Sequence, residues 1–300
     1  MVMNELYYGQ QELPDLDDID YMAGDGIVLT AREEDTAAEF TFDRDMLMDI
    51  LKRIYSREFH PLTEIEESLF EEIFRIMTEA TDEGFVRSGA EVPVGFRQTV
   101  DYRNAVWSAF KVHRMQRDVA SQLLDANGRL KPFEQWVKDV DPLLNHHVDH
   151  WLHTEYNTAV ARAHQAADWQ RFEANRDIMP NLRWMPSTSA KPGADHRPFW
   201  GVTLPMDHPF WNSHRPGDRW GCKCSLENTD EPATPLPDDP QPEQNRPAPG
   251  LDNNPGVDGK LFSDTHPYVR EATKEAAKVV ESFVGEYMEA RSATRQKKKP

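Results

Sequence analysis

Residues 143–176, "LLNHHVDHWLHTEYNTAVARAHQAADWQRFEANR", form the stretch that decides the fold of this chain. Apolar side chains recur along it with the period of an α-helix, and no proline interrupts it after Pro142. The apolar stripe becomes rich in alanine toward its end, which allows the backbone of a neighbouring helix to approach closely. Its members are Leu144, Val148, Trp151, Leu152, Ala159, Ala163, Ala166 and Ala167. We therefore expect the longest helix of the chain here.

Two polar features of this helix raise the question of function. Glu155 falls on the apolar stripe, where a carboxylate must be paired or protonated, and we expect it to pair with an arginine or with backbone amides of the segment that follows. His146, His150 and His153 line one flank at a spacing that can bind a metal. They lack the glutamate of a zinc-protease helix, so a polar flank is the favoured interpretation.

The residues before this helix indicate a mainly helical N-terminal half. Residues 1–44 contain only two basic residues among many acidic ones, which predicts an acidic arm that stays loose or orders on a partner. A helical period runs through residues 44–55, and Thr63 with Glu66 offers a capping box for the next helix. A third helical pattern begins near residue 101 and stops near Asn127 and Gly128. We predict a helical domain over residues 45–180.

Beyond Pro180 the composition changes to a small irregular module over residues 181–230, to which the helix 143–176 also belongs. Strand-like stretches lie at 182–185 and 222–226. Residues 231–257 hold eight prolines, which predicts a semi-extended linker. Residues 258–300 contain a last helix and the basic tail "RQKKKP". The expected fold class is α+β: a mainly helical N-terminal half, a module with short strands, a proline-rich linker and a C-terminal helix.

The net charge, the apolar stretches and the cysteine count of the chain indicate which partners and which compartment to expect. The formal net charge of -18 repels nucleic acid and anionic membranes at long range, so we expect nucleic-acid contact only indirectly or through the basic C-terminal tail. No apolar stretch approaches the length of a membrane span, and the first residues do not read as a signal peptide. We expect a soluble protein with no membrane partner. Two cysteines in 300 residues exclude a disulfide framework and fit a reducing compartment.

These two cysteines, Cys222 and Cys224, are candidate metal ligands. Zinc accepts thiolate and imidazole ligands, and a tetrahedral set can be drawn from the cysteines with His196, His208 and His214. The single residue between the cysteines argues against zinc, because structural zinc sites usually separate two cysteines by two to four residues. The favoured interpretation is that both thiols are structural and pack inward near Trp220. Zinc stays an open alternative, with ligands His196, His208, Cys222 and Cys224.

Catalytic sets are not evident in the sequence. A cysteine nucleophile needs a neighbouring base and a group that orients this base, and no such third group can be identified from the pattern. A metal nuclease built on Asp195, His196 and Arg197 lacks further converging ligands. We therefore predict that the protein is not an enzyme, binds no cofactor and has no small-molecule substrate.

The order of motifs across the module resembles the phage Mu F-like family of head morphogenesis, or minor capsid, proteins. The segments are "TEYNTA" from Thr154, "RWMPS" from Arg183, "DHRPFWG" from Asp195, "MDHPFW" from Met206 and "RPGDRWGCKCS" from Arg215, which together cover residues 154–226. Many members carry a histidine just before the closing cysteine pair, where this chain has Trp220 and Gly221. The residues that match the family pattern are Glu155, Asn157, Arg183, Trp184, Asp195, His196, Arg197, Gly201, Asp207, Pro209, Trp211, Pro216, Trp220, Cys222 and Cys224.

This resemblance implies a minor component of a phage or prophage virion that acts in head morphogenesis at or near the portal vertex. Its partners would be the portal protein and capsid or scaffold proteins. It would be found in the procapsid or head, and in the bacterial cytoplasm during assembly. The alternative is a metal-dependent hydrolase or effector that is packaged with the head and uses His196, His208 and Cys222.

Overall fold

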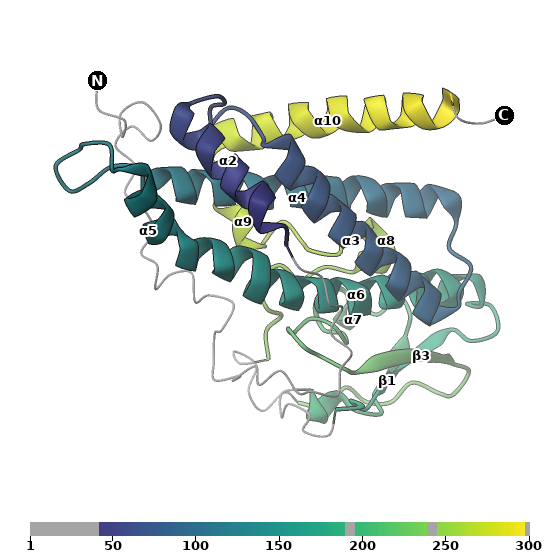
Figure 1. Cartoon of the computed structure of the whole chain (residues 1–300). Helices are drawn as coiled ribbons and strands as arrows, with labels where there is room; N and C mark the ends of the chain where they lie inside the picture. Colours follow the sequence, from purple (N-terminus) through teal and green to yellow (C-terminus); the bar gives the residue numbers. More distant parts are fainter. Residues whose placement is uncertain (1–41, 190–195, 239–244, 298–300) are drawn as a thin grey trace.

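The computed structural model describes residues 42–189, 196–238 and 245–297, without the side chains of residues 149, 150, 213 and 295–297 (Figure 1). Its first helical elements are α2 (Arg44–Ser56), α3 (Glu67–Ser88), α4 (Val94–Ser121), α5 (Phe133–Asn145), the π-helical turn η2 (His146–His150) and α6 (Trp151–Ala174). Next come β1 (Asn181–Met185), the 3-10 turn η3 (Arg197–Phe199), β2 (Thr203–Pro205), α7 (Phe210–Ser213) and β3 (Ser225–Thr229). The last are α8 (Pro255–Asp258), α9 (Pro267–Arg270) and α10 (Lys274–Lys297). The α+β prediction is confirmed; the predicted acidic arm lies almost wholly outside the described residues.

Side chains define the ends of the first helices. The carboxylate of Asp43 accepts hydrogen bonds from two backbone amides in the first turn of α2. Glu66 does the same for α3, where its Oε2 accepts from the backbone N–H of Leu69 at 2.6 Å. The capping box predicted at Thr63 is therefore wrong, because the helix begins three residues later than a cap at Thr63 requires. Glu66 also pairs with Arg53 of α2, which links the two helices.

The central helix is longer than its sequence pattern indicated. Pro142 lies in the last turn of α5 instead of ending it, and η2 connects α5 directly to α6. Helical backbone thus runs from Phe133 to Ala174 as one bent rod (Figure 1). Proline has no backbone N–H, so Pro142 removes one hydrogen bond from the helix. The wider π-helical turn η2 follows directly and lets the helix continue into α6.

The alanine-rich stripe of α6 packs closely against α3, as the sequence pattern predicted. Gly84 of α3 lies so near to Ala163 that an added Cβ would be 2.6 Å from the Cβ of Ala163. The side chains of Leu152, Ala159 and Ala163 are fully buried in a core shared with α2, α4 and α10. Small residues let the helix backbones approach, and larger side chains at both ends fill the space between them.

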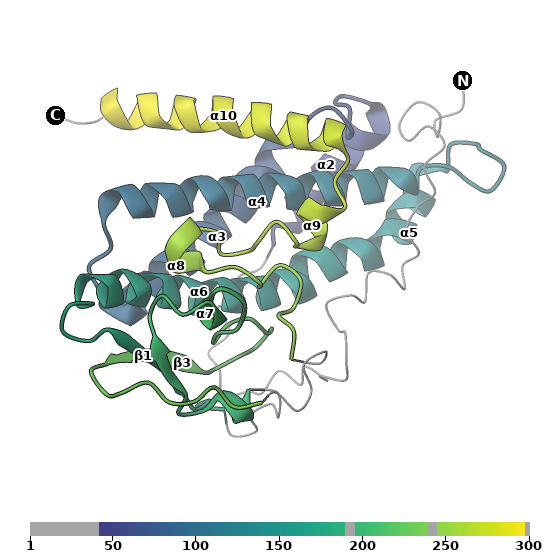
Figure 2. The same ribbon diagram turned by 180° about the vertical axis from the view of Figure 1, so that it is seen from behind.

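A three-stranded antiparallel sheet with the order β2-β1-β3 lies beside the C-terminal end of α6 (Figure 2). In the register, Leu182 of β1 faces Leu204 of β2, and Trp184 of β1 faces Leu226 of β3. The predicted closing strand 222–226 is displaced, because β3 begins at Ser225 and both cysteines precede it. The sheet has its own aromatic core, formed by Trp169, Phe172, Trp184, Phe199, Phe210 and Trp211 with aliphatic neighbours.

The segment after the sheet returns to the helical core. Leu251 and Leu261 are buried, and Arg162 of α6 donates hydrogen bonds to the carbonyl oxygens of both, at 3.2 and 2.6 Å. The expectation of an extended linker over 231–257 is therefore wrong for residues 245–257. Pro255 begins the short helix α8, the buried leucines anchor the segment along α6, and Gly256 packs directly on Trp169.

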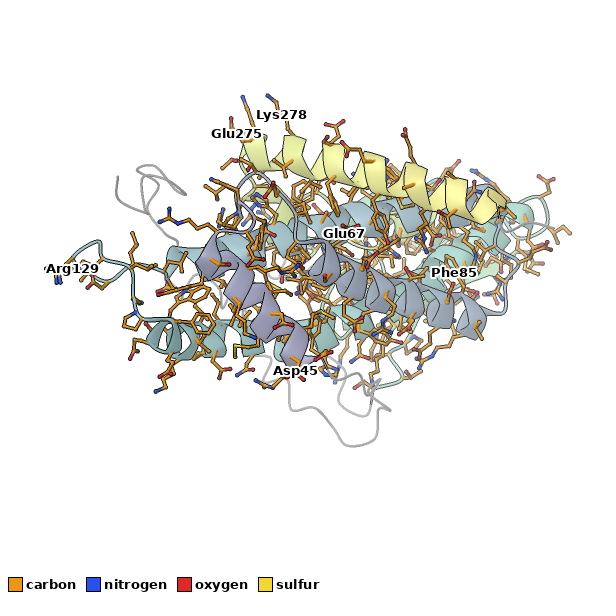
Figure 3. All side chains as sticks on the ribbon, turned by 45° about the horizontal axis from the view of Figure 1, so that its top comes forward. Asp45, Glu67, Phe85, Arg129, Glu275 and Lys278 are labelled. Atoms are coloured by element: carbon orange, nitrogen blue, oxygen red, sulfur yellow. The ribbon has the colours of Figure 1, made fainter. Side chains whose placement is uncertain are left out.

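Helix α10 closes the other side of the bundle over α3 and α4. The rings of Phe283 and Tyr287 meet Phe70 of α3 edge-on, with centroids 4.8 and 4.9 Å apart. Glu275 and Lys278 point away from the bundle on the outer face of α10 (Figure 3). Within the described residues, none of the helices has the length and apolar character that a membrane span requires.

Candidate functional site

Two loops of the small module bring one histidine and both cysteines together. His196 lies immediately before η3, whereas Cys222 and Cys224 lie between Gly221 and the start of β3. The positive φ of 70° at Gly221 turns the chain toward the cysteines, a conformation that glycine adopts at little cost. Residues 26 positions apart in the sequence thus become neighbours.

The imidazole of His196 is the centre of this cluster. Its Nδ1 atom lies 3.3 Å from Sγ of Cys222 and 3.9 Å from Sγ of Cys224. These three ligand atoms all lie within 4.8 Å of one another. His196 and Cys224 are buried, and Cys222 is half-buried. Both thiols therefore lie on the same side of the chain and face one imidazole nitrogen.

Asp218 orients the histidine ring. Its Oδ1 lies 2.8 Å from Nε2 of His196, and its Oδ2 accepts a hydrogen bond from the backbone N–H of Arg215 at 3.3 Å. A carboxylate can only accept at Nε2, so the neutral ring carries its proton there and turns the lone pair of Nδ1 toward the sulfurs. Asp218 is itself buried and also lies 3.7 Å from Nη1 of Arg219.

The acidities of the two thiols are shifted in opposite directions. The hydrogen bond from Cys222, opposed by burial, lowers the pKa of Cys224 to about 4. The same contact between the thiols, together with burial, raises the pKa of Cys222 well above its usual value. One proton is thus shared across the pair, and the thiolate form, which is the nucleophile and the metal ligand, is favoured at Cys224.

The remaining candidate histidines have other roles. His208 accepts a hydrogen bond at Nδ1 from the backbone N–H of Phe210, at 3.2 Å, and so stabilises the turn before α7. His214 stacks on Phe210, with ring centroids 5.2 Å apart. The ligand set proposed from the sequence is therefore too large, because the described cluster holds His196, Cys222 and Cys224 without these two rings.

Trp220 lies in a different core from the one expected. Its ring stacks on Phe262 at a centroid distance of 5.8 Å and meets His266 at 6.1 Å, both from the C-terminal segment. The prediction that the thiols pack near Trp220 is thus wrong. Cys224 instead packs with the aromatic core of the sheet, because Gly221 turns the chain between Trp220 and the cysteines.

Several residues of the family pattern hold the sheet together. Trp184 is fully buried, and its carbonyl oxygen accepts a hydrogen bond from the backbone N–H of Gly201 at 2.8 Å. Arg183 reaches across to β3, where its Nη1 lies 3.2 Å from Oε1 of Glu227. The φ of 80° at Gly201 completes the turn into β2.

Other residues of the pattern stabilise the turns around the sheet. Trp211 is buried, and its Nε1–H donates to the carbonyl oxygen of Pro205 at 3.0 Å. Asp207 pairs with Arg176 beyond the end of α6, at 3.0 Å. Pro209 directly precedes α7. The guanidinium of Arg197 lies 6.0 Å from the ring centroid of Trp200, and Asn157 is exposed on α6. Asp195 lies outside the described residues.

Glu155 is paired, although with a partner that the sequence pattern did not indicate. Its Oε2 lies 2.7 Å from Nζ of Lys111 on α4, and its Oε1 accepts a hydrogen bond from the hydroxyl of Tyr268 on α9 at 2.9 Å. The expected pairing of Glu155 with an arginine or with backbone amides of the module is therefore wrong, because Lys111 and Tyr268 bind its carboxylate. Lys111 was missed because it lies within a long helix, where a lysine is usually exposed.

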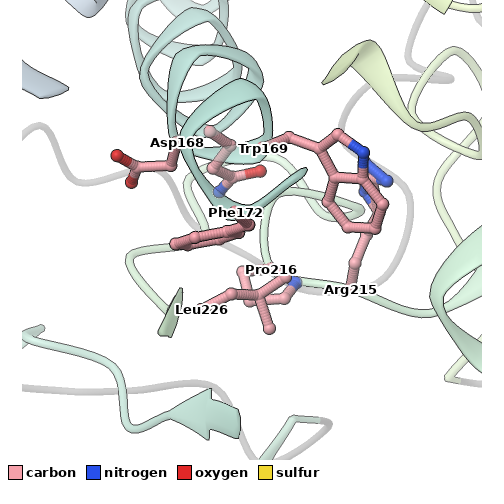
Figure 4. A pocket seen from close by; sticks show the side chains of 7 residues that line it. Asp168, Trp169, Phe172, Arg215, Pro216 and Leu226 are labelled. Atoms are coloured by element: carbon pink, nitrogen blue, oxygen red, sulfur yellow. The ribbon is translucent and has the colours of Figure 1, made fainter. Parts of the chain in front are cut away.

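A small pocket opens between the end of α6 and the start of the sheet (Figure 4). Its lining includes Trp169 and Phe172 of α6, Arg215 and Pro216 of the loop before the cysteines, and Leu226 of β3. The space has room for about one water molecule. It therefore offers no binding site for a small-molecule substrate.

Comparison with known families identifies the central part of the chain. Residues 118–227 match the family model described as Phage Mu protein F like protein. This range contains α5, η2, α6, the sheet, and the cluster of His196 with both cysteines. No curated protein and no solved structure matches the chain. The resemblance inferred from the motifs is thus confirmed for this region: residues 118–227 are similar to the phage Mu protein F-like family, which supports a protein of the phage head morphogenesis type.

Proposed function

We propose that the protein is a minor head protein that acts during assembly of a phage head at or near the portal vertex. The match of residues 118–227 to the phage Mu protein F-like family carries this proposal. The matched residues include the long helix and the sheet, whose side chains contribute to both buried clusters. We propose the portal protein and capsid or scaffold proteins as its partners, and the procapsid or head as its location.

A structural role, without catalysis, is the form of this proposal that the site favours. The alternative of a packaged metal-dependent hydrolase requires His196, His208 and Cys222 to act together. Among the described residues, the cluster that holds the other two does not include His208, whose Nδ1 accepts a hydrogen bond in the turn before α7. A binding or stabilising role for the remaining cluster needs no substrate cleft beside it.

Co-expression separates the proposed partners. The full chain is produced with the portal protein alone, with the major capsid and scaffold proteins alone, and with all three together. We expect co-purification with portal assemblies, and retention in procapsids only when the portal is present. Equal retention in portal-free procapsids would contradict the portal-vertex location.

A genetic experiment tests the role itself. A phage that lacks this reading frame should yield few infectious particles, and the full chain supplied from a plasmid should restore them. A chain without residues 154–226 should fail to do so, whereas D49N, a change at a single surface ion pair outside the family pattern, should restore normal yield. Normal infectivity of the deletion phage would overturn the proposal.

A further inference from the structure

We propose that His196, Cys222 and Cys224 bind a zinc ion through one imidazole nitrogen and two thiolates. The three side chains come from two separate loops and converge on one point inside the small module. This inference goes beyond the role in head assembly and does not depend on it.

The distances between the ligand atoms match a tetrahedral zinc site. Zinc–sulfur bonds of about 2.3 Å and zinc–nitrogen bonds of about 2.0–2.1 Å, at a tetrahedral angle, place sulfur and nitrogen about 3.6 Å apart. In the structure the two distances from Nδ1 of His196 are 3.3 Å to Cys222 and 3.9 Å to Cys224, one on each side of that value. An ion at the centre therefore requires shifts of only about 0.3 Å in each distance.

The kind of ligand selects the metal. Thiolate and imidazole together suit zinc, whereas magnesium and calcium require oxygen ligands. Two thiolates also balance the double positive charge of the ion, which makes burial of the site less costly than burial of bare thiolates. Among the described residues the cluster offers three ligands, so a water molecule takes the fourth tetrahedral position.

Asp218 acts as a positioning residue for this site. Metal-bound histidines commonly donate their second ring nitrogen to a carboxylate, which fixes the ring and strengthens its binding to the metal. Asp218 holds Nε2 of His196 at 2.8 Å, and its side chain is almost fully buried. The loop before it depends on Gly217, where an added Cβ would be 2.6 Å from Oε1 of Gln165.

Neither a catalytic cysteine nor simple packing explains why two thiols face one imidazole. A nucleophilic cysteine requires one base for one thiol, and the second sulfur adds nothing to it. Simple packing would not direct both sulfurs toward a polar nitrogen in a core that is otherwise apolar. A metal ion uses all three groups and the carboxylate behind them.

Such an ion would connect η3 to the start of β3. The segment between His196 and Cys222 includes β2, α7 and the loop of Asp218, and β3 pairs with the central strand β1. Since zinc ligands rarely come together in the unfolded chain, binding free energy adds to folding free energy. The site thus acts as a clamp on a module whose strands have only three to five residues.

Metal analysis of the reduced, full-length protein without a histidine tag tests the proposal. The protein is expressed in medium with zinc and purified by gel filtration. We expect inductively coupled plasma mass spectrometry to find one zinc ion per chain. Cobalt(II) added to the metal-free protein should give the near-ultraviolet charge-transfer band of thiolate ligands and the visible bands of tetrahedral geometry. Protein without metal, or with cobalt that shows no thiolate band, would overturn the proposal, and so would a different metal in place of zinc.

Variants locate the site. C222S/C224S should lose the zinc and the cobalt bands, whereas H208Q, at a histidine outside the cluster, should keep both. Zinc retained by C222S/C224S at full stoichiometry would contradict the assigned ligands. Because the double variant can also fail to fold, the cobalt spectrum of the unchanged protein remains the deciding measurement.

The role of Asp218 has a separate readout. D218N should weaken zinc binding by about 10- to 100-fold in competition with a chelator. The melting temperature of its metal-free form should stay close to that of the metal-free unchanged protein, and D218E should recover part of the affinity. Equal affinities of D218N and the unchanged protein would show that Asp218 does not position the ligand.

Discussion

Lys111, Glu155 and Tyr268 form a closed polar triangle inside the helical core. All three side chains are buried, and Nζ of Lys111 also donates to the hydroxyl of Tyr268 at 3.1 Å. Burial lowers the pKa of Lys111 and raises the pKa of Glu155, while the ion pair opposes both shifts. Each charge is therefore tolerated in the core only because the other is present.

This dependence predicts the result of a double-mutant cycle. E155L should lower the free energy of unfolding by about 3–5 kcal/mol, because it leaves the ammonium of Lys111 without its counter-charge. K111M/E155L removes both charges at once and should regain most of that loss. Urea denaturation at pH 7 measures both values. Additive losses in the double variant would contradict this account of the pair.

His266 makes the stability of the fold sensitive to acid. Burial, with Lys111 and Arg270 nearby, lowers the pKa of its imidazole to about 3. Between about pH 3 and 6.5 the ring is neutral in the folded state and protonated in the unfolded chain. The unfolded state then binds more protons, so stability decreases as the pH falls through this window.

H266N tests this effect and keeps a side chain able to cap α9. Between pH 7 and pH 5 the protonation of His266 should cost about 2 kcal/mol of unfolding free energy, and H266N should lose correspondingly less than the unchanged protein. Urea denaturation at the two pH values gives the difference, with H208N as the control outside this core. The same loss in H266N and in the unchanged protein would exclude His266 as the cause.

At the scale of the elements, the packing of α3 on α6 depends on one glycine. An added Cβ at Gly84 would collide with the carbonyl oxygen of Val160 and with Ala163, whereas an added Cβ at Gly285 in α10 meets nothing. Both glycines lie inside helices. Alanine at Gly285 therefore changes only the helix propensity, whereas alanine at Gly84 changes the helix propensity and also overpacks the interface.

G84A should lower the free energy of unfolding by about 1–3 kcal/mol, because the helices must move apart. G285A should raise it by up to about 1 kcal/mol, since alanine favours the helix and no contact opposes it. Both are measured by urea denaturation under the same conditions. Stabilisation by G84A would show that the helix interface can relax without cost.

The sequence predicted one side of this interface and not the other. The period of the alanines in α6 marks a face for close approach, because it depends on residues near each other in the chain. Gly84 is about 80 positions away from its partner, and nothing local in α3 distinguishes it from a glycine that merely tolerates the helix. At Thr63 the local pattern was present but misleading. The sequence has the spacing of a capping box there, yet the carboxylate of Glu66 caps α3 instead.

The candidate site shows the same limit. The sequence supplied His196, Cys222 and Cys224 as candidates, but also His208 and His214, because ligand type alone does not tell which rings converge. The spacing of the cysteines argued against zinc on the basis of sites whose ligands lie on one short turn. Here His196 comes from another loop, and Asp218 fixes its orientation through a contact across 22 residues.

For the whole molecule, buried polar contacts join the matched family region to segments before and after it. Arg162 of α6 is buried and donates to Gly217 within the region, but also to Leu251, Asn253 and Leu261 beyond its end. Glu155 depends on Lys111 before the region and on Tyr268 after it. The sequence did not indicate these contacts, because the proline-rich residues 231–257 have no periodic apolar pattern that would identify a buried segment.

A fragment of residues 118–227 should therefore fail to fold cooperatively, whereas residues 42–297 should unfold in one sharp transition. The fragment removes most hydrogen-bond partners of Arg162 and the ion-pair partner of Glu155, and it exposes the apolar face of α6. Circular dichroism during heating and binding of a hydrophobic dye distinguish the two fragments. We expect dye binding and a broad transition from the short fragment alone. A sharp transition without dye binding would show that residues 42–117 and 228–297 cover a module that already folds without them.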